Sequence, residues 1–259
     1  MTEVQAKLGL SVSKKTNYLN TDYLYLRNVT ISEWDIHAAG FSVLKYKKVL
    51  PEKELAELEA MDKHKRTVRE GLLQKYNPEV AKLIISTLED VRYQYVLQNS
   101  ISYDSILSIK KDAFFLINKI PKKNTVFDIF EFRKKGTYTS YLQLNKKEFY
   151  YCAYNRTLET KGISKEYLEN DNCQFLKDIQ NFMSLAERAN AIDLFRVFRD
   201  YRERYLNYEL PLETYRELDT GSFRIGKYVM NDVKEKFKHD LDISQNYLNY
   251  FLPLIQNIL

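Results

Sequence analysis

Between residues 106 and 154 the chain holds five short, strand-like segments in a row, separated by polar turns. The segments cover residues 106–109, 113–117, 126–132, 137–144 and 148–154. Strands that follow one another through short turns pair in antiparallel fashion. This region therefore predicts an antiparallel sheet, and the rest of the chain has to be arranged around it.

Helical patterns lie on both sides of this run. Residues 18–36 alternate as one or two further strands. Helical spacing covers residues 36–50, a charged and exposed stretch from Pro51 to Tyr76, a clear apolar stripe over 79–98, and then 175–208, 229–237 and 247–258. The order strand, helices, several strands, helices predicts an α+β fold.

Composition excludes several classes of protein. A chain of 259 residues with 44% hydrophobic content can bury a full core, as one large domain or as smaller subdomains. Nothing approaches the roughly 20 apolar residues that span a bilayer, and the first residues do not resemble a signal peptide. The two cysteines and three histidines lack the spacing of a zinc site or a disulfide framework, so we expect no membrane and a cytoplasmic location.

Basic residues are grouped, although the net charge is only +5. The groups are Lys45, Lys47 and Lys48; Lys63, Lys65, Arg66 and Arg69; Lys122 and Lys123; Arg133, Lys134 and Lys135; and Lys146 and Lys147. Such groups suit phosphate contacts and favour a nucleic-acid partner. The alternative is that they are solvated loops and helix faces.

Two carboxylates close apolar, strand-like runs. Asp35 ends the run 29–36, and Asp112 lies at a tight turn between two short strands. Carboxylates at a strand end and a hairpin tip can together hold two divalent metals about 3.5–4 Å apart, which serves phosphoryl transfer. The alternatives are that Asp35 is a helix N-cap and Asp112 an ordinary turn residue.

Several segments, in the same order as in the family, resemble the palm and fingers motifs of family B DNA polymerases. Asp35–Ser42 resembles D-x-x-S-L-Y-P-S, and Lys63–Gly71 matches both ends of K-x-x-x-N-S-x-Y-G. Lys110–Ala113 resembles the D-T-D-S hairpin and keeps its second aspartate. Lys146–Tyr150 and Thr160–Ile163 resemble the K-K-x-Y strand and a later lysine-glycine turn.

The resemblance implies a polymerase-like nucleotidyltransferase that adds nucleotides to a nucleic-acid 3′ end, with Asp35 and Asp112 as catalytic residues that bind Mg²⁺ or Mn²⁺. The implied contacts to a nucleoside triphosphate are Lys63, Arg66, Arg69, Gly40, Phe41 and Gly71. The implied contacts to a primer–template are Lys146, Lys147, Tyr150, Lys161 and Gly162.

The resemblance also implies a division of the chain into parts. These are a first palm segment at 1–50, helical fingers at 51–100, a second palm segment at 101–165 and a helical thumb at 166–259. In the thumb, Arg196, Arg199 and Arg202 would face the duplex.

Departures from the family pattern keep other functions open. Thr67 and Glu70 replace an asparagine and a tyrosine, Lys110 replaces an aspartate, and Gly40 stands where a tyrosine contacts the sugar. A catalytically degenerate palm that binds nucleic acid or a replication partner is one alternative, and a structural α+β interaction protein is another. A polymerase of this length would be minimal, and we expect it to be encoded by a phage or mobile element. It would act in DNA replication in the host cytoplasm, alone or with further protein subunits.

Overall fold

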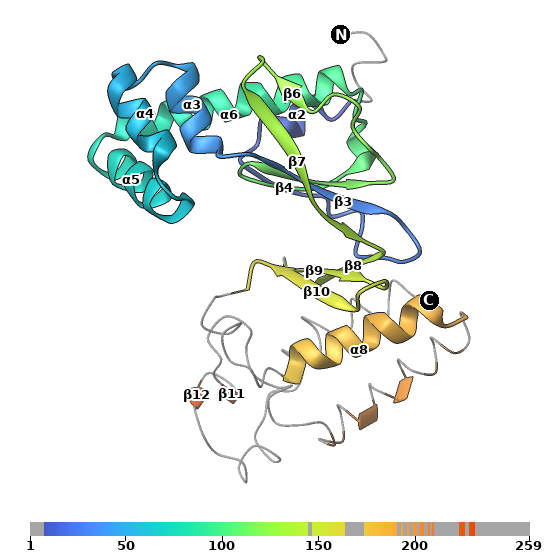
Figure 1. The fold of residues 1–259 in the computed structure, drawn as a ribbon. Coiled ribbons are helices and arrows are strands. Elements are labelled where there is room, and N and C mark those ends of the chain that lie inside the picture. The colour runs from blue at the N-terminus through green and yellow to red at the C-terminus, as the bar shows by residue number, and fades with distance from the viewer. Residues whose placement is uncertain are drawn as a thin grey trace. The chain divides into compact units, whose positions relative to one another are not determined.

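The computed structural model describes residues 8–144, 147–163 and 174–190, two strands at 223–225 and 228–230, and single residues between 193 and 209 (Figure 1). The chain divides into two compact units. Unit 1 comprises Met1–Asn20 and Thr30–Thr137, and unit 2 comprises Thr21–Val29 and Tyr138–Leu259. The predicted segment 101–165 is thus shared between the two units.

Unit 1 is built on a six-stranded sheet with the order β1-β4-β5-β3-β7-β6. The strands are β1 (Asn17–Leu19), β3 (Ile31–Ile36), β4 (Ile106–Lys110), β5 (Ala113–Ile117), β6 (Thr125–Val126) and β7 (Phe130–Tyr138). β5 pairs antiparallel with both β4 and β3, and Asp35 lies opposite Ala113. The apolar run of β5 is buried along its whole length, as expected for a central strand.

Helices complete unit 1. They are α2 (Leu10–Ser13), α3 (Ala39–Tyr46), α4 (Glu52–Ala60), α5 (Lys63–Tyr76), α6 (Pro78–Gln98) and the short 3₁₀ helix η1 (Tyr103–Ser105). The predicted stripe of α6 forms the core contact: Tyr95 stacks on Phe132 of β7, with ring centroids 3.6 Å apart, and also contacts Phe114 of β5. α6 therefore packs its apolar face on the sheet, while α5 buries none of its residues.

Unit 2 contains a four-stranded antiparallel sheet with the order β10-β9-β8-β2. Its strands are β2 (Tyr25–Leu26), β8 (Ser140–Leu144), β9 (Lys147–Cys152) and β10 (Thr157–Lys161). The helix α8 (Gln174–Arg188) is held at its last turn by Arg27, whose guanidinium donates to the carbonyls of Ala186 and Ala189 at 2.8 and 2.7 Å. β11 (Phe223–Ile225) and β12 (Tyr228–Met230) form a hairpin.

The structure confirms the α+β class, with antiparallel sheets and helices, but corrects several boundaries. The helix expected from Pro51 to Tyr76 is two helices, because Asp62 has extended backbone and its side chain caps the second by accepting from the Lys65 N–H. The strand expected at 126–132 is broken where Phe127 and Asp128 take positive φ angles. Tyr228–Met230 is a strand where the helix of 229–237 was expected to begin. Most of the predicted thumb, including Arg202, lies outside the described residues.

Candidate functional site

Asp35 and Asp112 meet at one end of the unit 1 sheet. Asp35 is the fifth residue of β3, and Asp112 lies in the turn that joins β4 to β5. The Ile36 N–H donates to the Asp112 carbonyl at 3.1 Å, which fixes the two backbones side by side. Burial, the charge of Asp112 and a hydrogen bond between the two carboxyls raise the pKa of Asp35 to about 6. Two carboxyl groups that share a proton in this way form a site that favours positive charge.

The structure rules out the N-cap alternative for Asp35. The N-cap of α3 is Ala38, which takes a left-handed conformation, and no side chain caps that helix end. Asp112 does lie in a turn, as the second alternative requires, but its carboxyl is directed to Asp35. A turn role alone therefore does not account for the pair.

Arg92 of α6 holds the turn that carries Asp112, and the sequence analysis missed it. Its side chain is 1% exposed, and it donates from Nε to the Ser13 carbonyl at 2.9 Å and from Nη1 to the Lys111 carbonyl at 2.6 Å. Burial lowers the pKa of Arg92, and the charges of Glu89 and Asp112 oppose that change. The sequence does indicate that Arg92 is buried, because it comes four residues after Leu88 and therefore falls on the apolar face of the helix.

A pocket of about 510 Å³ opens beside the two aspartates, entirely within unit 1. Its lining residues are Asp35, Ile36, His37, Ala38, Ala39, Gly40, Lys63, Arg66, Thr67, Glu70, Asp112, Arg133, Lys134 and Lys135. Five of these side chains are lysines or arginines, which come from the start of α5 and from β7. The pocket thus places a pair of carboxylates next to a cationic wall.

The β7 side of this wall is organised by ion pairs. The Lys135 ammonium lies 3.3 Å from Oε1 of Glu33, a carboxylate that is only 2% exposed. Arg133 contacts His37 Nδ1 at 3.0 Å and donates to Glu131 at 2.6 Å. Burial and the positive charge of Arg133 lower the pKa of His37, which favours its neutral form. The sequence showed the basic group at 133–135 but not that β7 would pair with β3 beside Asp35.

Three of the expected nucleotide-binding residues line the pocket and three do not. Lys63, Arg66 and Gly40 lie in it. Phe41 is buried in the core. The Arg66 guanidinium lies 5.4 Å from the centre of the Phe41 ring, so Phe41 stabilises Arg66 through a cation–π contact and does not line the pocket. Gly71 is exposed and a side chain built there would meet nothing within 4 Å.

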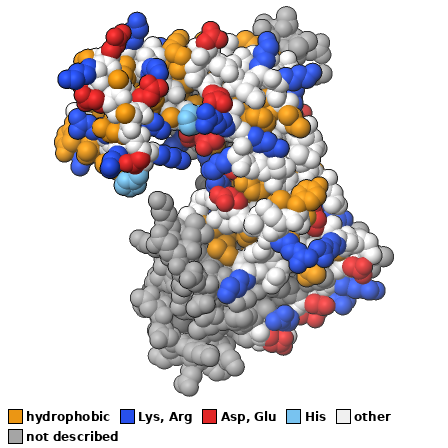
Figure 2. Space-filling model, in the orientation of Figure 1, with side chains coloured by type: hydrophobic (Ala, Val, Ile, Leu, Met, Phe, Trp, Pro, Cys, Tyr) orange, Lys and Arg blue, Asp and Glu red, His pale blue; other side chains and the backbone are white. Residues whose placement is uncertain are grey.

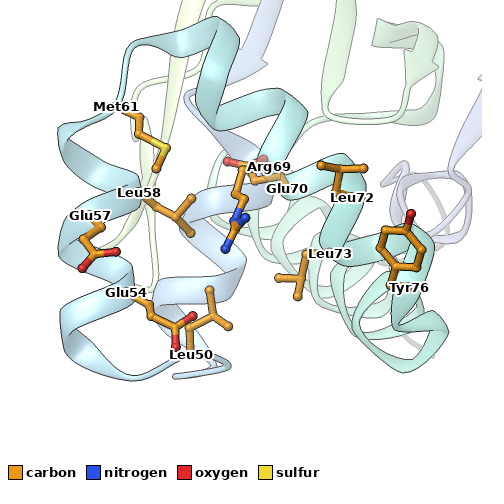
Figure 3. Close-up of a pocket in the computed structure, with 10 residues that line it drawn as sticks. All are labelled: Leu50, Glu54, Glu57, Leu58, Met61, Arg69, Glu70, Leu72, Leu73 and Tyr76. Atoms are coloured by element: carbon orange, nitrogen blue, oxygen red, sulfur yellow. The ribbon is translucent and has the colours of Figure 1, made fainter.

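Arg69 lines a different pocket, of about 500 Å³, between α4 and α5 (Figure 3). Its guanidinium reaches into the space beside Leu58. Each helical residue advances by about 100°, so Arg69 lies roughly 120° around the helix from Lys63, whereas Arg66, Thr67 and Glu70 stay near its face. Arg69 was expected to contact the triphosphate together with Lys63, but the two side chains line different pockets.

The expected primer–template residues belong to unit 2. Tyr150 is fully buried in β9 and donates to Glu148 at 2.7 Å, which gives it a core position. Lys147 begins β9, and Lys161 ends β10 with a 2.9 Å ion pair to Glu159. Gly162 is exposed with a φ angle of 83°, which suits glycine. Lys146 lies outside the described residues.

No group of three or more His, Cys, Asp or Glu side chains that could hold a metal occurs among the residues that the structure describes. Asp35 and Asp112 are the two carboxylates of the pocket that lie in hydrogen-bond contact with each other. Mg²⁺ is commonly held by one or two carboxylates together with substrate phosphates and water. The pair therefore fits a divalent cation that arrives with a phosphate ligand.

The raised pKa of Asp35 predicts a specific pH dependence of stability. The folded state retains the Asp35 proton up to about pH 6, whereas the unfolded chain releases it near 3.8, so the free energy of unfolding falls as pH rises through this window. Asp35→Asn should remove this loss and stabilise the protein at pH 7 by about 1 kcal/mol, a figure reduced for the solvent exposure of this half-buried group. Urea unfolding at pH 4 and pH 7 measures the difference, and an equal difference between wild type and variant at both values would contradict it.

In the described part of the chain, no helix is long and apolar enough to cross a membrane. Basic and acidic side chains are interspersed on the face of unit 1 seen in Figure 2, without a broad patch of one sign. The cationic character is thus a property of the pocket wall and is not shared by this whole face.

Comparison with known proteins places the chain in a phage family. No curated protein matches it. The model of the family described as "Bacteriophage PBS1 gene 130 protein" matches residues 8–259, which is nearly the whole chain. The protein therefore belongs to the bacteriophage PBS1 gene 130 protein family.

Proposed function

We propose that this phage protein is a polymerase-like nucleotidyltransferase that adds nucleotides to the 3′ end of a nucleic acid. The observation that carries the proposal is the meeting of Asp35 and Asp112 beside a wall formed by Lys63, Arg66 and the basic residues of β7. A triphosphate has the charge for that wall, and the carboxylate pair marks one end of the pocket. The ordered motif resemblance to the palm of family B DNA polymerases agrees with this reading.

The reaction requires one bond to form and one to break. The oxygen of a 3′-hydroxyl attacks the α-phosphorus of the triphosphate, the bond between the α- and β-phosphates breaks, pyrophosphate leaves and the hydroxyl proton passes to water. Lys63 and Arg66 would bind the leaving phosphates as fixed charges, and Lys135 would balance charge next to Asp35. Mg²⁺ or Mn²⁺ bound by Asp35 and Asp112 would supply the positive charge that activates the hydroxyl and neutralises the triphosphate.

A second candidate, a nucleotide- or nucleic-acid-binding protein without catalysis, is favoured by one observation. Glu33, the nearest further carboxylate on β3, is paired with Lys135, and the described residues offer no third metal-binding group. A site limited in this way can bind phosphates and still fail to transfer them.

The proposal is tested by incubating the protein with a primer, alone or on a DNA or RNA template, and with labelled ribo- or deoxynucleoside triphosphates in Mg²⁺ or Mn²⁺. Primer lengthening that requires the divalent cation is the expected result, and the combination that works identifies the template and sugar. Triphosphate binding without lengthening in every combination would favour the non-catalytic alternative.

Lys63→Ala is expected to weaken triphosphate binding about tenfold, because it removes a charge-assisted contact at the pocket wall. Lys65→Ala is the matched control: Lys65 is exposed, pairs with Asp62 at 3.4 Å and does not line the pocket. Equilibrium dialysis with labelled triphosphate and Mg²⁺ measures both variants. Equal weakening by the two substitutions would show that only the net charge matters.

A further inference from the structure

Glu70 is a third carboxylate that lines this pocket, and it also lines the neighbouring pocket between α4 and α5 (Figure 3). It comes from α5, where it shares the helix face of Lys63, Arg66 and Thr67. Its side chain is 13% exposed and its carboxylate lies directly over Gly40 of α3: a Cβ atom built on Gly40 would be 2.5 Å from Oε2. Glycine at position 40 therefore makes the space that Glu70 occupies.

The Glu70 carboxylate keeps its capacity to accept hydrogen bonds. Its closest cation, Nε of Arg66, is 3.9 Å from Oε1, which is too long for a hydrogen bond. Among the described residues no donor closer than this is directed to it. Burial raises the pKa of Glu70, which agrees with a carboxylate that is drawn out of water and only partly compensated by Arg66.

The charge pattern of the pocket restricts what such a carboxylate can face in a bound nucleotide. Triphosphate oxygens are repelled by Glu70 and attracted by the surrounding lysines and arginines. A carboxylate accepts hydrogen bonds from the sugar hydroxyls of a nucleotide and from the N–H groups of its base. Because Glu70 shares its helix face with Lys63 and Arg66, which would bind the phosphates, the part of the nucleotide nearest to it is the sugar, and a ribose carries hydroxyls on adjacent carbons. Carboxylates that bind a ribose 2′-hydroxyl recur in nucleotide-binding proteins.

We propose that Glu70, seated over Gly40, is the sugar-binding residue of this pocket and that the site prefers nucleoside triphosphates with a ribose 2′-hydroxyl over the 2′-deoxy forms. The inference rests on the proposed function, because it assumes that a triphosphate occupies the cationic wall. It goes further by naming the sugar and the residue that selects it.

The test compares the binding of ATP and 2′-deoxyATP, each with Mg²⁺, by equilibrium dialysis at pH 8. Wild-type protein should bind ATP about tenfold more tightly, as expected for the loss of one hydrogen bond to a charged acceptor. Glu70→Ala should reduce this ratio to less than about twofold. Glu57→Ala removes a carboxylate that lines the pocket between α4 and α5 but not the pocket of Asp35 and Asp112, and it should leave the ratio unchanged.

Gly40→Ala gives an independent variant that keeps the carboxylate. The added methyl group meets only the flexible end of Glu70 at close range, so the helix is retained while Glu70 has to move. The ATP preference should fall in this variant as well. Equal binding of the two nucleotides by wild type, a preference for 2′-deoxyATP, or a ratio unaffected by Glu70→Ala would overturn the inference while nucleotide binding stands. Failure of both nucleotides to bind would overturn the proposed function too.

Discussion

Replacing Asp112 by asparagine is expected to slow nucleotide addition by on the order of 1000-fold, because one charge of the carboxylate pair is lost at the place where the reaction needs it. Asn is well tolerated in turns, so the β4–β5 turn that carries residue 112 should keep its shape. Asp35→Asn should have an effect of the same size, and the double variant should be no worse than either single one, since the two carboxylates act together.

The same substitution should make the fold more stable. The two carboxyls repel each other when both are ionised, which is one cause of the raised pKa of Asp35. A higher melting temperature of Asp112→Asn, together with lost activity, is the pattern expected of a functional site that costs stability. Asp90→Asn, at an exposed position of α6, is the control and should change neither property. Full activity in Asp112→Asn would contradict the assignment.

Replacing Arg92 by methionine is expected to lower the free energy of unfolding by about 3–4 kcal/mol. The variant keeps the apolar length of the side chain but leaves the carbonyls of Ser13, which is buried, and of Lys111, at a part-buried contact, without their charged donor. Each such hydrogen bond is worth about 1.5–3 kcal/mol. Denaturant unfolding followed by circular dichroism measures the loss.

The Arg92→Met substitution should also disturb the turn that carries Asp112 at the pocket. Lys111 precedes Asp112 in the turn and takes a positive φ angle of 55°, a strained conformation that the hydrogen bond from Arg92 helps to hold. Conditions in which Arg92→Met is still folded should therefore show reduced triphosphate binding. Lys82→Ala, an exposed position on the same helix, should alter neither property. Wild-type stability in Arg92→Met would show that the guanidinium is dispensable.

Local patterns predicted the parts of the site that follow from single segments. Asp35 and Asp112 each close an apolar run, and antiparallel pairing of β3 with β5 then brings the two strand ends together. The helix α5 and its basic start at Lys63 were likewise visible, because helical spacing and charge are local properties.

Pairings between distant segments were not accessible in this way. Arg133 and Lys135 line the pocket because β7 pairs with β3. These two strands are about 100 residues apart in the sequence, and no local pattern predicts that they pair. Arg69 was wrongly expected beside Lys63, because each step of three residues falls about 60° short of a full helical turn and two such steps add up to about 120°. Tyr150 was expected to contact the primer–template, and its burial depends on the sheet of unit 2.

The dependence of nucleotide addition on the carboxylate pair is measured by a primer-extension assay that compares wild-type protein with the Asp35→Asn, Asp112→Asn double variant, purified alike, in Mg²⁺ and in Mn²⁺. We expect wild type to lengthen the primer and to release one pyrophosphate for each nucleotide added, and the double variant to do neither. Lengthening of equal rate in both proteins would contradict this expectation, because the reaction would then not depend on the carboxylate pair at the pocket.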